Sequence, residues 1–124
     1  MVNSPKKILV AEDEKAIAKA LELKLKHEGF SVKLALNGKE ALDILSKEKF
    51  DLVLLDLMMP KLDGFGVLDG LKNIQNKTPV IVVSNLGQEE DKKRVKSLGA
   101  IDFLVKSDTP VAEIVNKIKK YFNL

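Results

Sequence analysis

Three acidic residues lie directly after apolar runs of the chain. Glu12 and Asp13 follow residues 8–11, and Asp56 follows residues 52–55. If both runs are central strands of a parallel sheet, their carboxyl ends meet at the edge where ligands bind in such sheets. Crowded carboxylates disfavour one another's ionised forms, so the group must hold a proton or recruit a cation. Oxygen ligands without histidine or cysteine suit Mg²⁺, and the sequence predicts a magnesium site here.

Ser84 and Lys106 end the next two strand-like runs and are expected at the same edge. A lysine supplies a point positive charge and a serine a hydroxyl donor, and together they could grip a phosphoryl group. An aspartate can itself accept a phosphoryl group once the incoming charge is neutralised. We therefore expect Asp56 to be the nucleophile, whereas Glu14 is typical of an acid in the first turn of a helix.

The elements that position these residues alternate between strand-like runs and helix-like segments. The expected strands are residues 8–11, 31–35, 52–55, 80–83 and 102–105. This alternation predicts an α/β fold with a doubly wound, five-stranded parallel sheet and helices on both faces. The first, third and fourth runs are continuously apolar, as central strands should be, which predicts the strand order 2-1-3-4-5.

Helix ends are also marked in the sequence. The last helix has an apolar stripe at helical spacing, formed by Val111, Ile114, Val115, Ile118 and Phe122. Thr109 is expected to cap this helix, with Pro110 at its first position. Asn37, followed three residues later by a glutamate, has capping-box spacing, and Gly29 and Gly99 lie where left-handed helix ends belong.

Composition limits the class of protein. At 124 residues the chain is expected to form one domain, residues 1–124, and its longest apolar runs of four residues are far below the ~18 needed to cross a bilayer. The chain begins without the features of a signal peptide, so we expect a cytoplasmic protein. It has no cysteine, and 21 basic and 18 acidic residues are spread along it, which favours solubility over nucleic-acid binding.

Four segments together resemble the response-regulator receiver domain of two-component signalling. They are residues 8–13 (ILVAED), 54–64 (LLDLMMPKLDG), 82–85 (VVSN) and 103–106 (FLVK). They occur in the order typical of that family and extend over nearly the whole chain. The resemblance implies a flavodoxin-like, CheY-like fold and a signalling switch controlled by phosphorylation.

The resemblance also implies a role for each site residue. Asp56 would take a phosphoryl group from the phosphohistidine of a sensor histidine kinase or phosphotransfer protein. Glu12, Asp13, Asp56 and the backbone carbonyl of Met58 would hold Mg²⁺, and Lys106 would pair with the phosphoryl group. The domain would then assist its own phosphorylation without being an enzyme that turns over.

Two further residues would report phosphorylation. Ser84 would move its hydroxyl toward the phosphoryl group, and Phe103 would turn inward behind it. The face formed by the fourth helix, fifth strand and fifth helix would then change and bind a downstream effector. Asp102, with Lys93 or Arg94 and Lys117 on the flanking helices, weakly resembles the charged dimer face of winged-helix response regulators. This resemblance adds a homodimer to the expected partners, with low weight because surface ion pairs are common.

Several positions depart from the commonest pattern of the family. Ser107 replaces a proline that usually follows a cis bond, and since a cis bond to another residue costs about 3–4 kcal/mol we predict a trans bond. Ser84 replaces threonine, and Asn85 replaces alanine and would narrow access to the phosphoryl group. Met58 and Leu86 are apolar and cannot orient an attacking water, which predicts slow self-dephosphorylation.

Other functions are weighed against the same residues. A metal-dependent phosphatase with an aspartate nucleophile usually needs a carboxylate two residues beyond it, where this chain has Met58. A nucleotide-binding relative of the fold needs a phosphate-cradling loop after the first strand, where Glu12 and Asp13 stand. The lysines of residues 92–96 adjoin acidic residues 89–91 without interleaved aromatics, which indicates a solvated or protein-docking face. A degenerate receiver that acts without phosphorylation is the remaining alternative.

Overall fold

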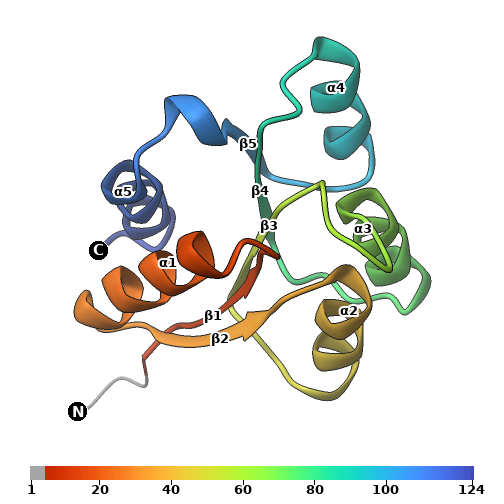
Figure 1. Ribbon diagram of the computed structural model, residues 1–124. Helices are drawn as coiled ribbons and strands as arrows, with labels where there is room; N and C mark the ends of the chain where they lie inside the picture. The colour runs from red at the N-terminus through yellow and green to blue at the C-terminus, as the bar shows by residue number, and fades with distance from the viewer. Residues whose placement is uncertain (1–4) are drawn as a thin grey trace.

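The computed structural model describes residues 5–124 and has one five-stranded parallel sheet (Figure 1). Its strands are β1 (Lys7–Ala11), β2 (Ser31–Ala35), β3 (Leu52–Leu55), β4 (Val80–Ser84) and β5 (Asp102–Val105). Their order is β2-β1-β3-β4-β5, which confirms the predicted sheet with β2 and β5 at its edges. The expectation of a cytoplasmic protein rests partly on the first residues of the chain, and residues 1–4 lie outside the described part.

Five helices cover the two faces of the sheet. They are α1 (Lys15–His27), α2 (Gly38–Lys47), α3 (Gly64–Asn73), α4 (Glu89–Ser97) and α5 (Val111–Tyr121), with a short 3₁₀ helix, η1 (Lys106–Asp108), before α5. Figure 1 shows α1 and α5 on one face and α2, α3 and α4 on the other. Within residues 5–124 no helix combines the length and the apolar character that crossing a membrane would require.

Alternate residues of the central strands serve the two faces. In β1, Ile8 and Val10 pack toward α1 and α5, whereas Leu9 and Ala11 pack toward α2 and α3. This alternation is the period of a strand, and burial on both faces explains why these runs are continuously apolar. All four residues of β3 and all five of β4 are buried, but every residue of β5 is only partly buried. The sheet is therefore packed most tightly at its centre.

Most predicted helix ends are confirmed. Asn37 caps α2 by accepting a hydrogen bond from the Glu40 N–H at 2.8 Å, and Gly29 and Gly99 adopt φ of 94° and 102°. The cap predicted at Thr109 is wrong. Its hydroxyl instead donates to the Val105 carbonyl at 2.7 Å, and Pro110 is the N-cap residue of α5, one position before the helix. Threonine hydroxyls often hydrogen-bond to nearby backbone carbonyls, and here this bond takes the place of helix capping.

Candidate functional site

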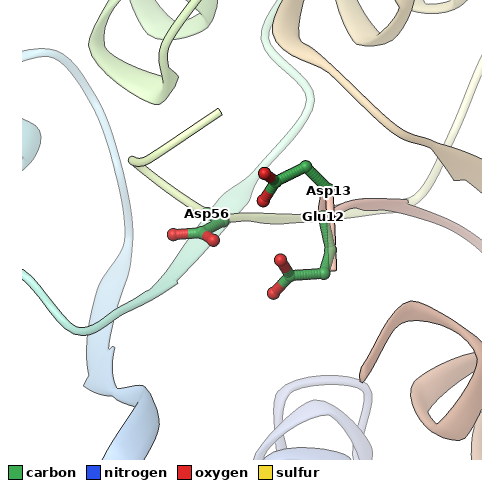
Figure 2. A group of neighbouring side chains, drawn as sticks. All are labelled: Glu12, Asp13 and Asp56. Atoms are coloured by element: carbon green, nitrogen blue, oxygen red, sulfur yellow. The ribbon is translucent and has the colours of Figure 1, made fainter. Parts of the chain in front are cut away.

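The three predicted carboxylates lie together at the carboxyl edge of the sheet. Glu12 and Asp13 follow β1, Asp56 follows β3, and carboxylate oxygens of all three lie within 4.8 Å of one another. Figure 2 shows the carboxylate of Asp13 above and that of Glu12 below the level of the Asp56 carboxylate, with both directed toward it. Glu12 and Asp56 are 3% and 5% exposed, and Asp13 is partly buried. Three converging oxygen donors, two of them nearly dry, fit a hard divalent cation such as Mg²⁺.

Lys106 directly follows β5 and brings a positive charge into this cluster at the carboxyl edge of the sheet. Its Nζ lies 2.8 Å from Asp56 Oδ2 and 2.6 Å from Glu12 Oε1, and its side chain is only 11% exposed. Glu14 Oε1 lies 3.6 Å away, on a side chain that is 59% exposed. The ammonium thus bridges the two buried carboxylates and offsets their mutual repulsion.

Burial and charge act on these groups in opposite directions. Burial raises the pKa of Glu12 to about 7, although the hydrogen bond from Lys106 and one from the Glu14 N–H lower it. Burial lowers the pKa of Lys106, but hydrogen bonds and Coulomb attraction to Asp56 and Glu12 outweigh this, and the net pKa is raised. Lys106 therefore stays charged, while Glu12 is close to exchanging a proton at neutral pH.

Backbone contacts fix the segment that carries Asp56. The Asp56 N–H donates to the Ala11 carbonyl at 3.0 Å, and Asp56 Oδ1 accepts the Met58 N–H at 3.2 Å. Gly64 packs directly beneath: a Cβ there would lie 2.6 Å from the Asp56 carbonyl oxygen and 2.7 Å from the Leu57 Cα. Only glycine fits such a close approach to backbone, so the start of α3 supports the backbone at Asp56.

Glu14 differs from its prediction as a first-turn acid. It is the N-cap residue of α1, its side chain makes no capping hydrogen bond, and its N–H donates to Glu12 Oε2 at 3.1 Å. Its place beside Lys106 was missed because the sequence shows which residues end a strand but not how far a long side chain reaches across strands.

The two predicted switch residues, Ser84 and Phe103, lie on β4 and β5. Ser84 is fully buried, and its Oγ accepts the Leu86 N–H at 3.3 Å. Phe103 is partly buried and packs against the core beneath α2, α3 and α4. Ser84 is the last residue of β4 and lies where the strand meets its loop, whereas Phe103 is the second residue of β5 and pairs with Val82.

The loop after β5 follows the path predicted for a serine at 107. No peptide bond of the described chain is cis, so the Lys106–Ser107 bond is trans, and the chain continues into η1. The Ser107 N–H donates to Asn85 Oδ1 at 2.8 Å. The sequence marked Asn85 and Ser107 as separate departures from a pattern and did not reveal that they contact each other.

Charges on the α4, β5 and α5 face are only partly arranged as expected. Lys117 Nζ lies 3.6 Å from Asp102 Oδ2, but the Arg94 guanidinium stacks 4.0 Å from the Phe65 ring centroid. Stacking covers one face of the Phe65 ring and leaves the Arg94 charge in water. An exposed ion pair with Asp102 would contribute no more stabilisation than this contact.

Comparisons with known proteins agree with this fold. Residues 8–119 match the family model described as the response regulator receiver domain. The receiver domain of the Francisella response regulator 1452 superposes with a TM-score of 0.88 at 33% identity, covering 95% of this chain and 97% of that one. CheY of Borrelia burgdorferi, in a structure described as a CheX-CheY-BeF3-Mg+2 complex, superposes with a TM-score of 0.87 at 30% identity, covering 95% and 90%. The chain belongs to the response regulator receiver domain family.

Curated relatives are longer than this chain. The probable transcriptional regulator ycf27 of Porphyra purpurea is 44% identical over 110 residues, which is 89% of this chain and 45% of that protein. The uncharacterized transcriptional regulatory protein YkoG of Bacillus subtilis is 41% identical over 99 residues, which is 80% of this chain and 43% of that protein. The chain therefore spans less than half the length of these relatives.

Proposed function

We propose that Asp56 accepts a phosphoryl group from a phosphohistidine of a sensor histidine kinase or phosphotransfer protein. In this step the P–N bond to the imidazole breaks, a P–O bond to an Asp56 carboxylate oxygen forms, and the leaving imidazole keeps the electron pair and takes a proton from water. The observation that carries the proposal is the position of Lys106 Nζ, 2.8 Å from Asp56 Oδ2 in a nearly dry cluster. An ammonium placed there neutralises charge that arrives with the phosphoryl group.

Glu12, Asp13 and Asp56 are the residues proposed to hold Mg²⁺, with the Met58 carbonyl as a further ligand. The proposal is supported by the convergence of the three carboxylates within 4.8 Å. When bound, the ion would supply charge neutralisation to the phosphoryl oxygens. Glu12 must be ionised to take part, and its pKa of about 7 makes that state accessible at neutral pH.

Phosphorylation is proposed to act as a switch through Ser84 and Phe103. The added group carries nearly two negative charges and favours the loop arrangement in which the Ser84 hydroxyl donates to it. Ser84 then gives up its contact with the Leu86 N–H, and Phe103 moves inward. The α4, β5 and α5 face changes with these residues and is proposed to bind a downstream effector or a second copy of the domain.

The phosphorylated state is proposed to be long-lived. Met58 and Leu86 lie two residues beyond Asp56 and Ser84, and neither side chain can hydrogen-bond an attacking water. The same Met58 argues against a phosphatase, because no carboxylate stands there to protonate a leaving group. The domain is therefore proposed to work in the cytoplasm as a phosphoacceptor that turns over slowly.

The deciding experiment is incubation with phosphoramidate or acetyl phosphate and Mg²⁺, followed by intact mass. The wild type should gain one phosphoryl group and Asp56→Asn none, while the exposed control Asp69→Asn should behave as wild type. A mass increase of one phosphoryl group in Asp56→Asn would show that another residue is the acceptor. No gain with any donor would favour the degenerate receiver, and continuous release of phosphate would favour the phosphatase.

A further inference from the structure

One contact joins the two loops that carry the proposed phosphoryl-binding groups. The Ser107 N–H donates to Asn85 Oδ1 at 2.8 Å between residues 22 positions apart in the chain. Asn85 directly follows Ser84, and Ser107 directly follows Lys106. The bond therefore links the residue after the buried hydroxyl to the residue after the buried ammonium.

The bond lies just beyond the end of a strand ladder. β4 and β5 pair up to Ser84 and Val105, and both strands end there. One step further the Asn85 side chain supplies the acceptor that a neighbouring strand would otherwise provide. Ser107 can serve as the donor because it keeps a backbone N–H, which a proline at this position would lack.

Lys106 is consequently held from both sides of its own backbone. On one side, Thr109 Oγ1 donates to the Val105 carbonyl at 2.7 Å, and the Thr109 N–H to the Lys106 carbonyl at 3.3 Å. On the other side, the Ser107 N–H is held by Asn85. These contacts fix the start of the long side chain whose Nζ reaches Asp56 and Glu12.

We propose that Asn85 is a positioning residue that clamps the loop after β5 through the Ser107 N–H, holds Lys106 for phosphoryl transfer, and couples movement of Ser84 to that loop. The kinetic part of this inference rests on the proposed function, but the clamp itself does not. Asn85 and Ser107 act as a pair: the amide side chain is useful only where residue 107 keeps its N–H.

The clamp is tested first by amide hydrogen exchange, measured by NMR on the Ser107 N–H without any phosphodonor. Asn85→Ala should accelerate exchange about fivefold, the loss expected for one hydrogen bond at a solvent-accessible site. Asn85→Asp keeps an acceptor oxygen and should restore protection. Equal exchange rates in wild type and Asn85→Ala would overturn the clamp, whether or not the domain is ever phosphorylated.

The positioning role is tested by phosphorylation rates over a range of phosphoramidate concentrations at fixed Mg²⁺. Asn85→Ala and Ser107→Pro should each lower the rate at saturating donor about fivefold. The donor concentration giving half-maximal rate should change less than twofold, because Lys106 placement matters most in the transition state. Ser107→Ala keeps the N–H and should match wild type, since its hydroxyl makes no hydrogen bond within residues 5–124.

The double variant Asn85→Ala with Ser107→Pro separates a shared bond from two independent effects. If both changes remove the same bond, the double variant is no slower than the slower single variant. Multiplied effects, or an altered half-saturating concentration with an unchanged maximal rate, would refute the positioning role. If wild type accepts no phosphoryl group, the proposed function fails and the exchange measurement alone decides the clamp.

Discussion

The carboxyl edge of the sheet, where the candidate site lies, has two halves that are built differently. The half formed by β1 and β3 carries the acids, and backbone contacts such as Asp56 N–H to the Ala11 carbonyl hold it. The half formed by β4 and β5 carries Ser84 and Lys106, and a single side-chain contact joins its loops. β3 is wholly buried, whereas β5 is only partly buried throughout. We call the β1 and β3 half rigid and the β4 and β5 half soft. The acids lie on the rigid half, whereas Ser84, which is proposed to move, lies on the soft half together with Lys106, which its loop contacts hold in place.

The largest effect is expected where the two halves meet, at Lys106. Lys106→Met should slow phosphorylation of Asp56 at least about 100-fold, because removing one preorganised charge from a dry site costs that much or more. The measurement is the initial rate by intact mass. Lys120→Met, an exposed lysine on α5, is the control and should leave the rate unchanged. A rate within threefold of wild type would show that the ammonium is not needed for transfer.

The rigid half should tolerate no added side chain at Gly64. Gly64→Ala places a Cβ 2.6 Å from the Asp56 carbonyl oxygen and should lower the free energy of unfolding by about 3 kcal/mol. Gly87→Ala in the soft half meets only the Val105 side chain at 3.5 Å and should change stability by less than about 1 kcal/mol. Urea unfolding of the two variants compares the halves directly, and equal losses would contradict the distinction.

Glu12 should give the protein without metal a pH-dependent stability. Its pKa is about 7 in the folded state and 4.5 as the ordinary value, so the folded protein binds the extra proton between these values. The contribution of Glu12 to the free energy of unfolding is fully present below pH 4.5 and is lost as the pH rises through about 7. The loss is on the order of 2–3 kcal/mol. Glu12→Gln should flatten the unfolding free energy across this window, whereas an unchanged slope would assign it to other groups.

The smallest effect concerns the lifetime of the phosphorylated state. Met58→Asn and Leu86→Asn each place a hydrogen-bonding group where water is expected to attack, and each should speed loss of the phosphoryl group about tenfold. Leu23→Asn, on an exposed apolar residue of α1, serves as the control. Loss from wild type within seconds would remove the basis for this prediction.

Sequence reasoning reached the rigid half more completely than the soft half. Continuous apolar runs identified β1, β3 and β4, and strand order then placed Glu12, Asp13 and Asp56 together. These inferences use the periodicity of apolar residues, which can be read from short segments of the sequence, and the strand order that follows from it. The Asn85 to Ser107 bond and the path of Thr109 depend on how two loops run in space, and no local pattern encodes that.

Helix α4 illustrates a consequence of uneven anchoring. Only Val95 of its nine residues is buried, whereas five residues of α3 are buried. With so little apolar surface to expose, this helix can detach and refold at a small fraction of the free energy needed to unfold the domain. A change in this helix can therefore leave the sheet beneath intact, so the domain can alter one surface without unfolding its core.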